Sequence, residues 1–361
     1  MEQRRMFLAG LVHLMAITFV VMVVFNALGG SGYEALFNQN TGQVSANYTV
    51  YITPWFVLFT LYCRRTEIVI LAKLLNLLLA LFNQNTGQVS ANYTVYITPA
   101  GFTFSIWSII YIFLGAGAIY CVSTVYRRSG PSSRVFVQPV VLNWQFYVAL
   151  ALNYSLNTAW IFIWDRKLMV VASIFLFFIA GTGWLSFAVA SVRAKKACEN
   201  RKGGLPIPAV LKEVRLQRIL IHNGIALYTT WTTIASLLNA NIAFQYFGNF
   251  DAETTSLVCL SILLTVMIGW FILENTRLDP YVRYTLVQYP VIIFATFGIL
   301  NRQGDQSRPD GPVPENVRIL TWLVLGVASV QLCARYAITI YRYRTRPLFQ
   351  VEPQPVPTVE Q

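Results

Sequence analysis

The chain has 361 residues, of which 56% are hydrophobic and only 12% are charged, and its mean hydropathy is +0.53. This composition excludes an ordinary soluble domain and is typical of a polytopic membrane protein. In a soluble chain the net charge of +12 would suggest a nucleic-acid partner, but here the basic residues lie between apolar runs and after residue 341. Cytoplasmic loops that face anionic lipid show this pattern, so the expected partner is the lipid bilayer and no nucleic acid.

Eight apolar stretches are long enough, or nearly so, to cross the ~30 Å hydrocarbon core as helices. They lie at 6–28, 102–126, 141–164, 168–192, 219–244, 256–273, 282–300 and 319–341. The predicted fold is therefore all-α, a polytopic membrane bundle of about eight transmembrane helices.

The distribution of charge between these stretches predicts their orientation. The loops after the second and fourth spans are rich in Lys and Arg, and the fourth loop, 193–218, is the most basic of all. The loop after the fifth span carries Asp251 and Glu253 and no basic residue. Because basic loops remain in the cytoplasm, we expect both ends of the chain to be cytoplasmic and the Asp251 loop to lie outside.

A twenty-residue segment occurs twice. Residues 35–54 recur without a single change at 80–99. Structural repeats normally diverge, so perfect identity indicates a recent duplication or a mis-joined gene model. Removing 55–99 would place Pro54 directly before Ala100 and restore one continuous loop. The unit therefore resembles an insertion, natural or artefactual.

The apolar part of this unit, 55–82, is interrupted by four charged side chains. Neither half reaches ~20 uninterrupted apolar residues, so we expect an interfacial or re-entrant helix. Each copy of the duplicated segment also carries an Asn-x-Thr sequon. Asn47 and Asn92 are therefore glycosylation candidates, which weakly favours a loop facing the lumen or the outside.

The second span carries aromatic residues at helical spacing. Trp107, Tyr111 and Gly115 follow one another in steps of four, so they share one face of a helix. A small residue in such a row allows a neighbouring helix to approach closely, while the two rings each offer a flat face and one polar atom. Ordinary helix packing and an aromatic belt are the alternative interpretation.

Two further spans contain amides and tryptophans in apolar surroundings. The third span has Asn157 and Trp160, and the fifth has Trp231, followed by Ala235 and Leu238-Asn239. An amide in hydrocarbon costs free energy unless it finds a partner. Asn157 and Asn239 are therefore expected to face the bundle interior and to bind each other or a ligand, unless they merely join helices.

These three patterns, in this order, resemble the TspO/translocator protein family, the tryptophan-rich sensory proteins. The resemblance covers about residues 6–244 without the insertion, and implies a TspO-like five-helix core with a three-span C-terminal extension. It also implies a pocket for hydrophobic planar molecules such as porphyrins or sterols. By that resemblance, eight residues line or support the pocket: Trp107, Tyr111, Asn157, Trp160, Trp231, Ala235, Leu238 and Asn239.

Two departures from the family pattern bear on this pocket. The family's first loop usually has a Trp and a double proline before the second span, where this chain reads Thr98-Pro99-Ala100-Gly101-Phe102. The three extra spans could also cover or replace the pocket, so ligand identity does not transfer.

The predicted organisation has five parts. They are a first transmembrane helix at 1–34, a duplicated loop at 35–99 with its inserted segment 55–82, core helices two to five at 100–245, three additional transmembrane helices at 246–341, and a disordered cytoplasmic tail at 342–361.

The predicted function is binding of a small hydrophobic planar ligand, with transport or sensing of that ligand left open. A secondary transporter or proton-coupled carrier that uses Glu274 is an alternative, and so is a structural membrane protein without a ligand. No nucleophile–base pair, phosphate loop, CxxC pair or metal-ligand spacing occurs, so we expect no enzyme and no metal site. No cofactor is predicted with certainty, and the family resemblance allows a porphyrin or a sterol. The sequons favour the plasma membrane or secretory pathway, the family resemblance allows the mitochondrial outer membrane, and the oligomeric state is left open, a homo-oligomer included.

Overall fold

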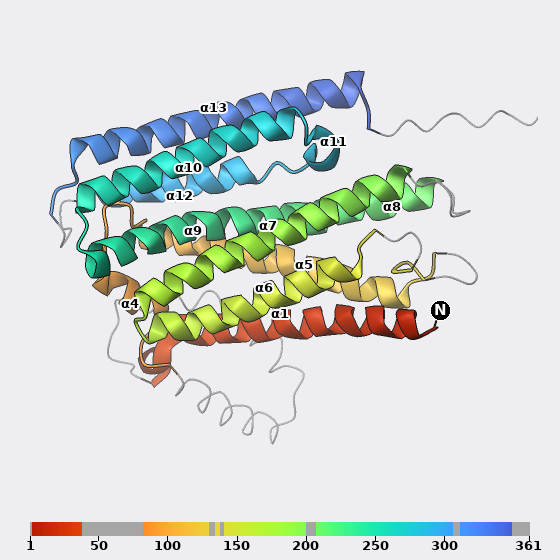
Figure 1. The fold of residues 1–361 in the computed structure, drawn as a ribbon, viewed down its shortest axis with the longest axis horizontal. Helices are drawn as coiled ribbons and strands as arrows, with labels where there is room; N and C mark the ends of the chain where they lie inside the picture. The colour runs from red at the N-terminus through yellow and green to blue at the C-terminus, as the bar shows by residue number, and fades with distance from the viewer. Residues whose placement is uncertain are drawn as a thin grey trace, which may run out of the picture.

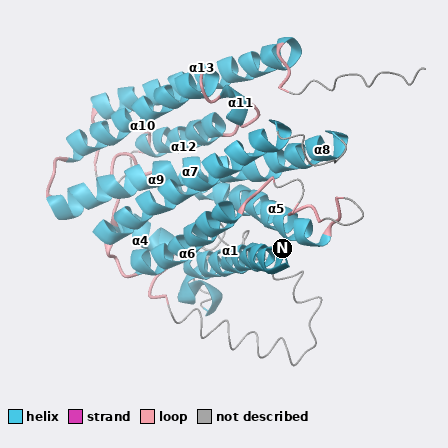
Figure 2. Cartoon of the chain, turned by 45° about the vertical axis from the view of Figure 1, so that its right-hand side comes forward, coloured by secondary structure: helices cyan, strands magenta, loops and turns pink. Residues whose placement is uncertain are grey.

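The computed structural model describes residues 2–37, 82–129, 134–137, 141–199, 207–305 and 311–348. Within these ranges the chain is helical and contains no strand (Figure 2). Six helices there are long and apolar enough to cross a membrane. They are α1 (Glu2–Phe37), the continuous pair η2 (Gly101–Ser105) and α5 (Ile106–Tyr126), α6 (Trp144–Asp165), α7 (Met169–Glu199), α10 (Ala252–Asn275) and α13 (Glu315–Thr345). The predicted all-α polytopic membrane bundle is confirmed.

Two more long helices occupy the remaining predicted spans. α9 (Asn223–Gly248) carries many buried Thr, Ser and Asn side chains, which lower its hydropathy. α12 (Gln288–Gln303) has 16 residues and is therefore only ~24 Å long. The eight predicted spans thus correspond to eight long helices, of which six qualify as spans by length and composition alone.

α12 begins six residues later than predicted. The short helix α11 (Asp279–Val282) precedes it, and an irregular linker joins the two. Asn223 of α9 donates a hydrogen bond to Tyr284 O at 3.1 Å and accepts one from Leu286 N at 3.2 Å. These two bonds supply partners for a carbonyl and an N–H group of the linker. The linker backbone can therefore stay irregular without leaving these groups unpaired.

The helices lie side by side along the long axis of the molecule (Figure 1). α10, α12 and α13 lie along one side, α1, α5 and α6 along the other, and α7 and α9 between them. α9 packs against α5 and α7, and also against α10 and α12. α7 approaches α9 closely at Gly183, where an added Cβ would lie 2.2 Å from Thr229 Cγ2. α9 is therefore the shared wall of both sides of the bundle.

The basic loop predicted at 193–218 is wrong, because α7 continues to Glu199 and a further helix follows. α8 (Ile207–Gln217) runs through a π-helical turn, η3 (Arg218–His222), directly into α9. Val214 of α8 packs against Ala194 of α7, while Lys212 and Arg215 are exposed. α8 is thus amphipathic, and its basic residues lie on the solvent-facing side of a helix rather than in a loop.

The predicted start of a disordered tail at 342 is also too early. α13 continues to Thr345, and Arg342 and Arg344 lie in its last turn. Residues 349–361 lie outside the described residues, as do Asn47 and nearly all of the inserted segment 55–82.

A completely buried ion pair joins α10, α12 and α13. Arg335 Nε lies 3.4 Å from Glu274 Oε2, and both side chains have no exposed area. Tyr289 donates to Glu274 Oε1 at 2.6 Å, and Trp270 Nε1 donates to Oε2 at 3.0 Å. Arg335 also donates to Asn275 Oδ1 at 2.8 Å. Each charge is compensated by an opposite charge and by hydrogen bonds, as burial requires.

A second ionic cluster closes the same end of these helices. Asp279 accepts from Arg283 Nε at 3.1 Å, and lies 2.7 Å from Arg342 Nη1. Burial opposes ionisation of the Asp279 carboxyl, but the hydrogen bonds and charges of Arg283 and Arg342 outweigh it and hold its pKa below the ordinary value. Arg342 also donates to Asn275 O, the last residue of α10, at 2.8 Å. The cluster therefore places positive charge at the negative end of the α10 dipole.

Arg335→Met should lower the free energy of unfolding by about 3–5 kcal/mol, because it leaves the Glu274 carboxylate buried without a counter-charge. The double variant Glu274→Gln, Arg335→Met removes both charges and should lose much less. Thermal unfolding in one detergent measures both, with Arg344→Met on the exposed last turn of α13 as the neutral control. Equal losses in the single and double variants would show that the ion pair does not hold these helices.

The Asp279 cluster predicts a pH dependence at the acid end. A carboxyl with a depressed folded pKa contributes stability that is present above its unfolded pKa of about 3.9 and is lost as the pH falls through the folded value. The melting temperature of Asp279→Asn should therefore lie below that of the wild type at pH 5–7, and the difference should shrink below about pH 4. A difference that is independent of pH from 3 to 7 would contradict this assignment.

Candidate functional site

Aromatic side chains of α5 and α9 gather around one indole. The Trp107 ring stacks on Tyr111 with centroids 5.5 Å apart. Across the helix interface, it lies 6.2 Å from the Tyr228 ring and 6.5 Å from Trp231, the latter at an interplanar angle of 84°. The structure thus brings together three predicted residues, Trp107, Tyr111 and Trp231, and adds Tyr228. We call these four residues the aromatic cluster.

The 3₁₀ turn η2 closes one end of the aromatic cluster. Its Phe104 lies edge-on to Trp231, with ring centroids 6.5 Å apart. The turn forms because Thr103 N–H and Oγ1 both bind Ala100 O, at 3.0 and 2.6 Å. Trp231 is buried, whereas Trp107 and Tyr111 are half-buried. In an edge-to-face contact the edge of one ring lies against the face of the other, so the ring that contributes its edge keeps its own faces free of that partner.

Asn157 of α6 connects three helices. Its Oδ1 accepts from Asn26 Nδ2 of α1 at 2.7 Å, and its Nδ2 donates to Tyr228 OH of α9 at 3.2 Å. Asn157 is 1% exposed. It lies in the interior as expected, but its partners are Asn26 and Tyr228 and not Asn239. Its amide therefore contacts the aromatic cluster through the Tyr228 hydroxyl.

The remaining predicted residues lie one or two helical turns farther along. Asn239 donates to Ala235 O of its own helix at 3.1 Å, and its buried Oδ1 has no hydrogen-bond partner among the described residues. Trp160 stacks on Trp164 at 5.5 Å, and its Nε1 is likewise buried without a partner. Ala235 and Leu238 are half-buried between these groups and the hydrophobic clusters. This part of the bundle therefore offers one unsatisfied donor and one unsatisfied acceptor.

Three contributors, Tyr228, Asn26 and Phe104, are absent from the sequence prediction. Tyr228 precedes Trp231 by three residues and so lies on the same helix face, which is a signal that spacing alone could have supplied. Asn26 is a single amide at the end of the first apolar run, and nothing local identifies its partner. Phe104 reaches the cluster only through the geometry of η2.

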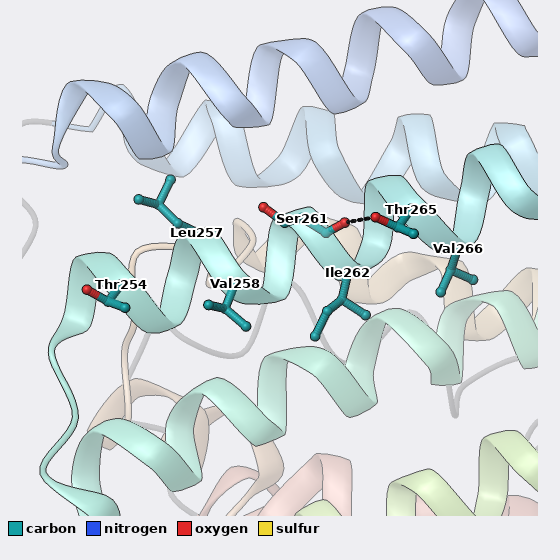
Figure 3. Close-up of a pocket in the computed structure, with 7 residues that line it drawn as sticks. All are labelled: Thr254, Leu257, Val258, Ser261, Ile262, Thr265 and Val266. Carbon is teal, nitrogen blue, oxygen red and sulfur yellow. Dashed lines mark hydrogen bonds between the residues drawn. The ribbon is translucent and has the colours of Figure 1, made fainter.

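A hollow of about 430 Å³ lies elsewhere, along α10 (Figure 3). All seven of its lining residues belong to α10: Thr254, Leu257, Val258, Ser261, Ile262, Thr265 and Val266. Val258 and Val266 are about half exposed, and the Thr265 hydroxyl is already bonded to Ser261 O at 2.8 Å. None of the predicted residues lines it. We interpret it as a lipid-facing depression and not as the site.

The sequon at Asn92 falls on a described helix. Asn92 is the last residue of α4 (Thr86–Asn92), and its side chain is exposed. The following Tyr93 contacts Tyr246, near the end of α9, with ring centroids 5.2 Å apart. Asn92 therefore lies at the end of the bundle where α9 turns into α10, which is the end carrying Asp251 and Glu253.

A comparison of the chain with known protein families gives one match. A family model described as TSPO-like protein matches residues 65–334. The chain belongs to the TSPO-like protein family. The match runs through α10 and α12 and into α13, which the resemblance drawn from the sequence left outside, and it does not reach α1. Comparisons with curated proteins and with solved structures give no match. The chain is thus a multi-pass membrane protein of the TSPO type.

Asn157→Ala should lower the stability of this TSPO-like protein by about 0.6–2 kcal/mol, because it removes both interhelical hydrogen bonds of the amide. Tyr228→Phe should cost less, and the double variant should cost less than the sum, since the two residues share one bond. Thr158→Ala, whose hydroxyl bonds only to Tyr154 O of the same helix, is the matched control. Thermal unfolding in detergent measures these losses of stability. If Asn157→Ala loses no more stability than Thr158→Ala, the two hydrogen bonds of Asn157 do not join these helices.

Proposed function

We propose that this TSPO-like protein binds a small hydrophobic planar molecule, porphyrin-like or sterol-like, at the aromatic cluster. One observation carries the proposal: the Trp107 indole has ring contacts with three aromatic side chains from two helices, inside a membrane bundle. Flat ring faces suit a planar apolar ligand. Ala235 follows Trp231 by about one helical turn and so lies on the same helix face. Its small side chain leaves space for that ligand beside the indole.

The unsatisfied polar atoms support the same proposal. Trp160 Nε1 supplies a donor, and Asn239 Oδ1 supplies an acceptor. A ligand carboxylate would accept from the indole, and a ligand hydroxyl would donate to the amide. Buried polar atoms without a partner are rare in native proteins, and a ligand that binds them gains the free energy their burial costs.

We also propose an orientation. The end of the bundle with α8, α11 and the last turn of α13 exposes Lys212, Arg215 and Arg344. The opposite end carries Asp251 and Glu253 at the start of α10. By the positive-inside bias, the basic end is cytoplasmic and the end with Asn92 faces outward. Both ends of the chain are then cytoplasmic.

The alternative of a proton-coupled carrier depends on Glu274. In the structure this carboxylate contacts Arg335, Tyr289 and Trp270 and has no exposed area. A compensated charge at a helix end favours a structural role over a proton site. The carrier therefore remains an outcome of the test and is not the function we propose.

The proposal is tested by titrating the protein in nanodiscs with protoporphyrin IX and following the absorbance of the porphyrin. Trp107→Ala and Trp231→Ala should each weaken binding roughly tenfold, since each removes an aromatic contact worth about 1.4 kcal/mol. Trp322→Ala removes an indole that is 59% exposed on α13, and should leave the affinity unchanged. A sterol competitor distinguishes the two ligand classes.

Three results would count against this function. Non-saturable binding would indicate partition into lipid and leave a structural membrane protein, and equal weakening by Trp322→Ala would show that the loss is not specific to the aromatic cluster. Glu274→Gln should leave porphyrin binding unchanged. Loss of pH-dependent transport in that variant would instead support the carrier.

A further inference from the structure

α12, outside the predicted five-helix core, makes direct backbone contact with η2. Ala100 N–H donates to Gly298 O of α12 at 3.0 Å. A Cβ added at Gly298 would lie 2.0 Å from Thr103 Cγ2 and 3.6 Å from Pro99 Cβ. The first distance is impossible for real atoms, so only glycine permits this approach. The contact places the α12 backbone against the turn that carries Phe104.

Two more contacts hold the segment before α5 to the C-terminal helices. The ring of Phe102 contacts Phe294 at 5.9 Å and Phe297 at 6.2 Å, both edge-on. Gln303, the last residue of α12, donates to Tyr96 O at 3.2 Å. α12 thus contacts this segment at three successive places.

The same helix continues into the core of the aromatic site. Val291 and Ala295 of α12 belong to the hydrophobic cluster that contains Trp231. Phe104 of η2 lies against Trp231, and η2 leads directly into α5 and Trp107. A displacement of η2 away from α12 would therefore move Phe104 off Trp231.

We infer that α12 is a positioning element of the aromatic site. Through Gly298 it holds η2 so that Phe104 stays against Trp231, and it thereby sets how slowly a bound planar molecule leaves. The ligand part rests on the proposed function. The holding of η2 by α12 does not, and the two parts have separate measurements.

The experiment exchanges one methyl group between the two helices. Gly298→Ala adds a methyl group that meets Thr103 Cγ2. Thr103→Ser removes that Cγ2 and keeps the hydroxyl that bonds Ala100 O. The double variant should therefore restore the contact, while Thr103→Ser alone should stay close to the wild type. Gly326→Ala on α13, where an added Cβ meets nothing within 4 Å, is the matched control.

The first measurement is hydrogen–deuterium exchange of peptides spanning 98–106 in nanodiscs. Gly298→Ala should speed exchange there, and the double variant should reverse the increase. Unchanged exchange in Gly298→Ala would overturn the inference. Should Gly298→Ala not fold, rescue by the double variant supports the inference. If neither folds, Phe294→Leu, which removes the ring contact to Phe102, must speed exchange in the same peptides or the inference is wrong.

The second measurement is the dissociation rate of protoporphyrin IX. Gly298→Ala should release it about 5–10 times faster, with the double variant close to the wild type, since changes within one site act mostly on dissociation. Faster exchange with an unchanged dissociation rate would show that α12 holds η2 and would overturn its role in ligand release. If the wild type does not bind porphyrin, the proposed function is wrong. The exchange data still decide whether α12 holds η2.

Discussion

The bilayer core offers no hydrogen-bond partner, so the polar groups inside this bundle depend on partners from the protein or from a bound ligand. This constraint explains α9, which is too polar to qualify as a span by composition and yet lies at the centre. Its hydroxyls bond back to its own helix, as Thr229 does to Ile225 O at 2.8 Å, and Asn241 donates to Ser256 Oγ of α10 at 3.0 Å. Helices on both sides shield it from lipid. A site that needs polar atoms at membrane depth can therefore be built on α9, where the neighbours of the polar atoms are protein.

The sequence predicts the helices well because apolar length is a local property. The prediction from sequence fails where a contact with a residue distant in the chain determines the local structure. The high charge of segment 193–218 predicts a loop. The prediction is wrong because the packing of Val214 against Ala194, which gives α8 its buried face, is not a local property of the sequence. The late start of α12 has the same origin, because Asn223 satisfies the linker from 61 and 63 residues away.

The candidate site also contains features that sequence spacing predicts and features that depend on packing. Trp107 and Tyr111 can be predicted to share one face of a helix because helical spacing fixes which side chains lie together, whereas only the family resemblance places Trp231, on another helix, beside them. The sequence predicts that the amides of Asn157 and Asn239 need hydrogen-bond partners, but it does not identify those partners. Asn157 binds Asn26 and Tyr228, whose pairing depends on how α1, α6 and α9 pack, and Asn239 donates to its own helix. Sequence spacing thus predicts faces, and only packing identifies pairs.

The role of the C-terminal helices follows from how α12 is held. At its first turn, Tyr289 binds the buried Glu274 carboxylate, which Arg335 of α13 compensates. Nine residues farther, or ~14 Å along the helix axis, Gly298 lies against η2. A rigid helix that is fixed at one end by a fully buried ion pair transmits that fixation to its other end. By this inference the ion pair at the first turn of α12 helps to hold η2, and with it Phe104, against Trp231 of the aromatic cluster.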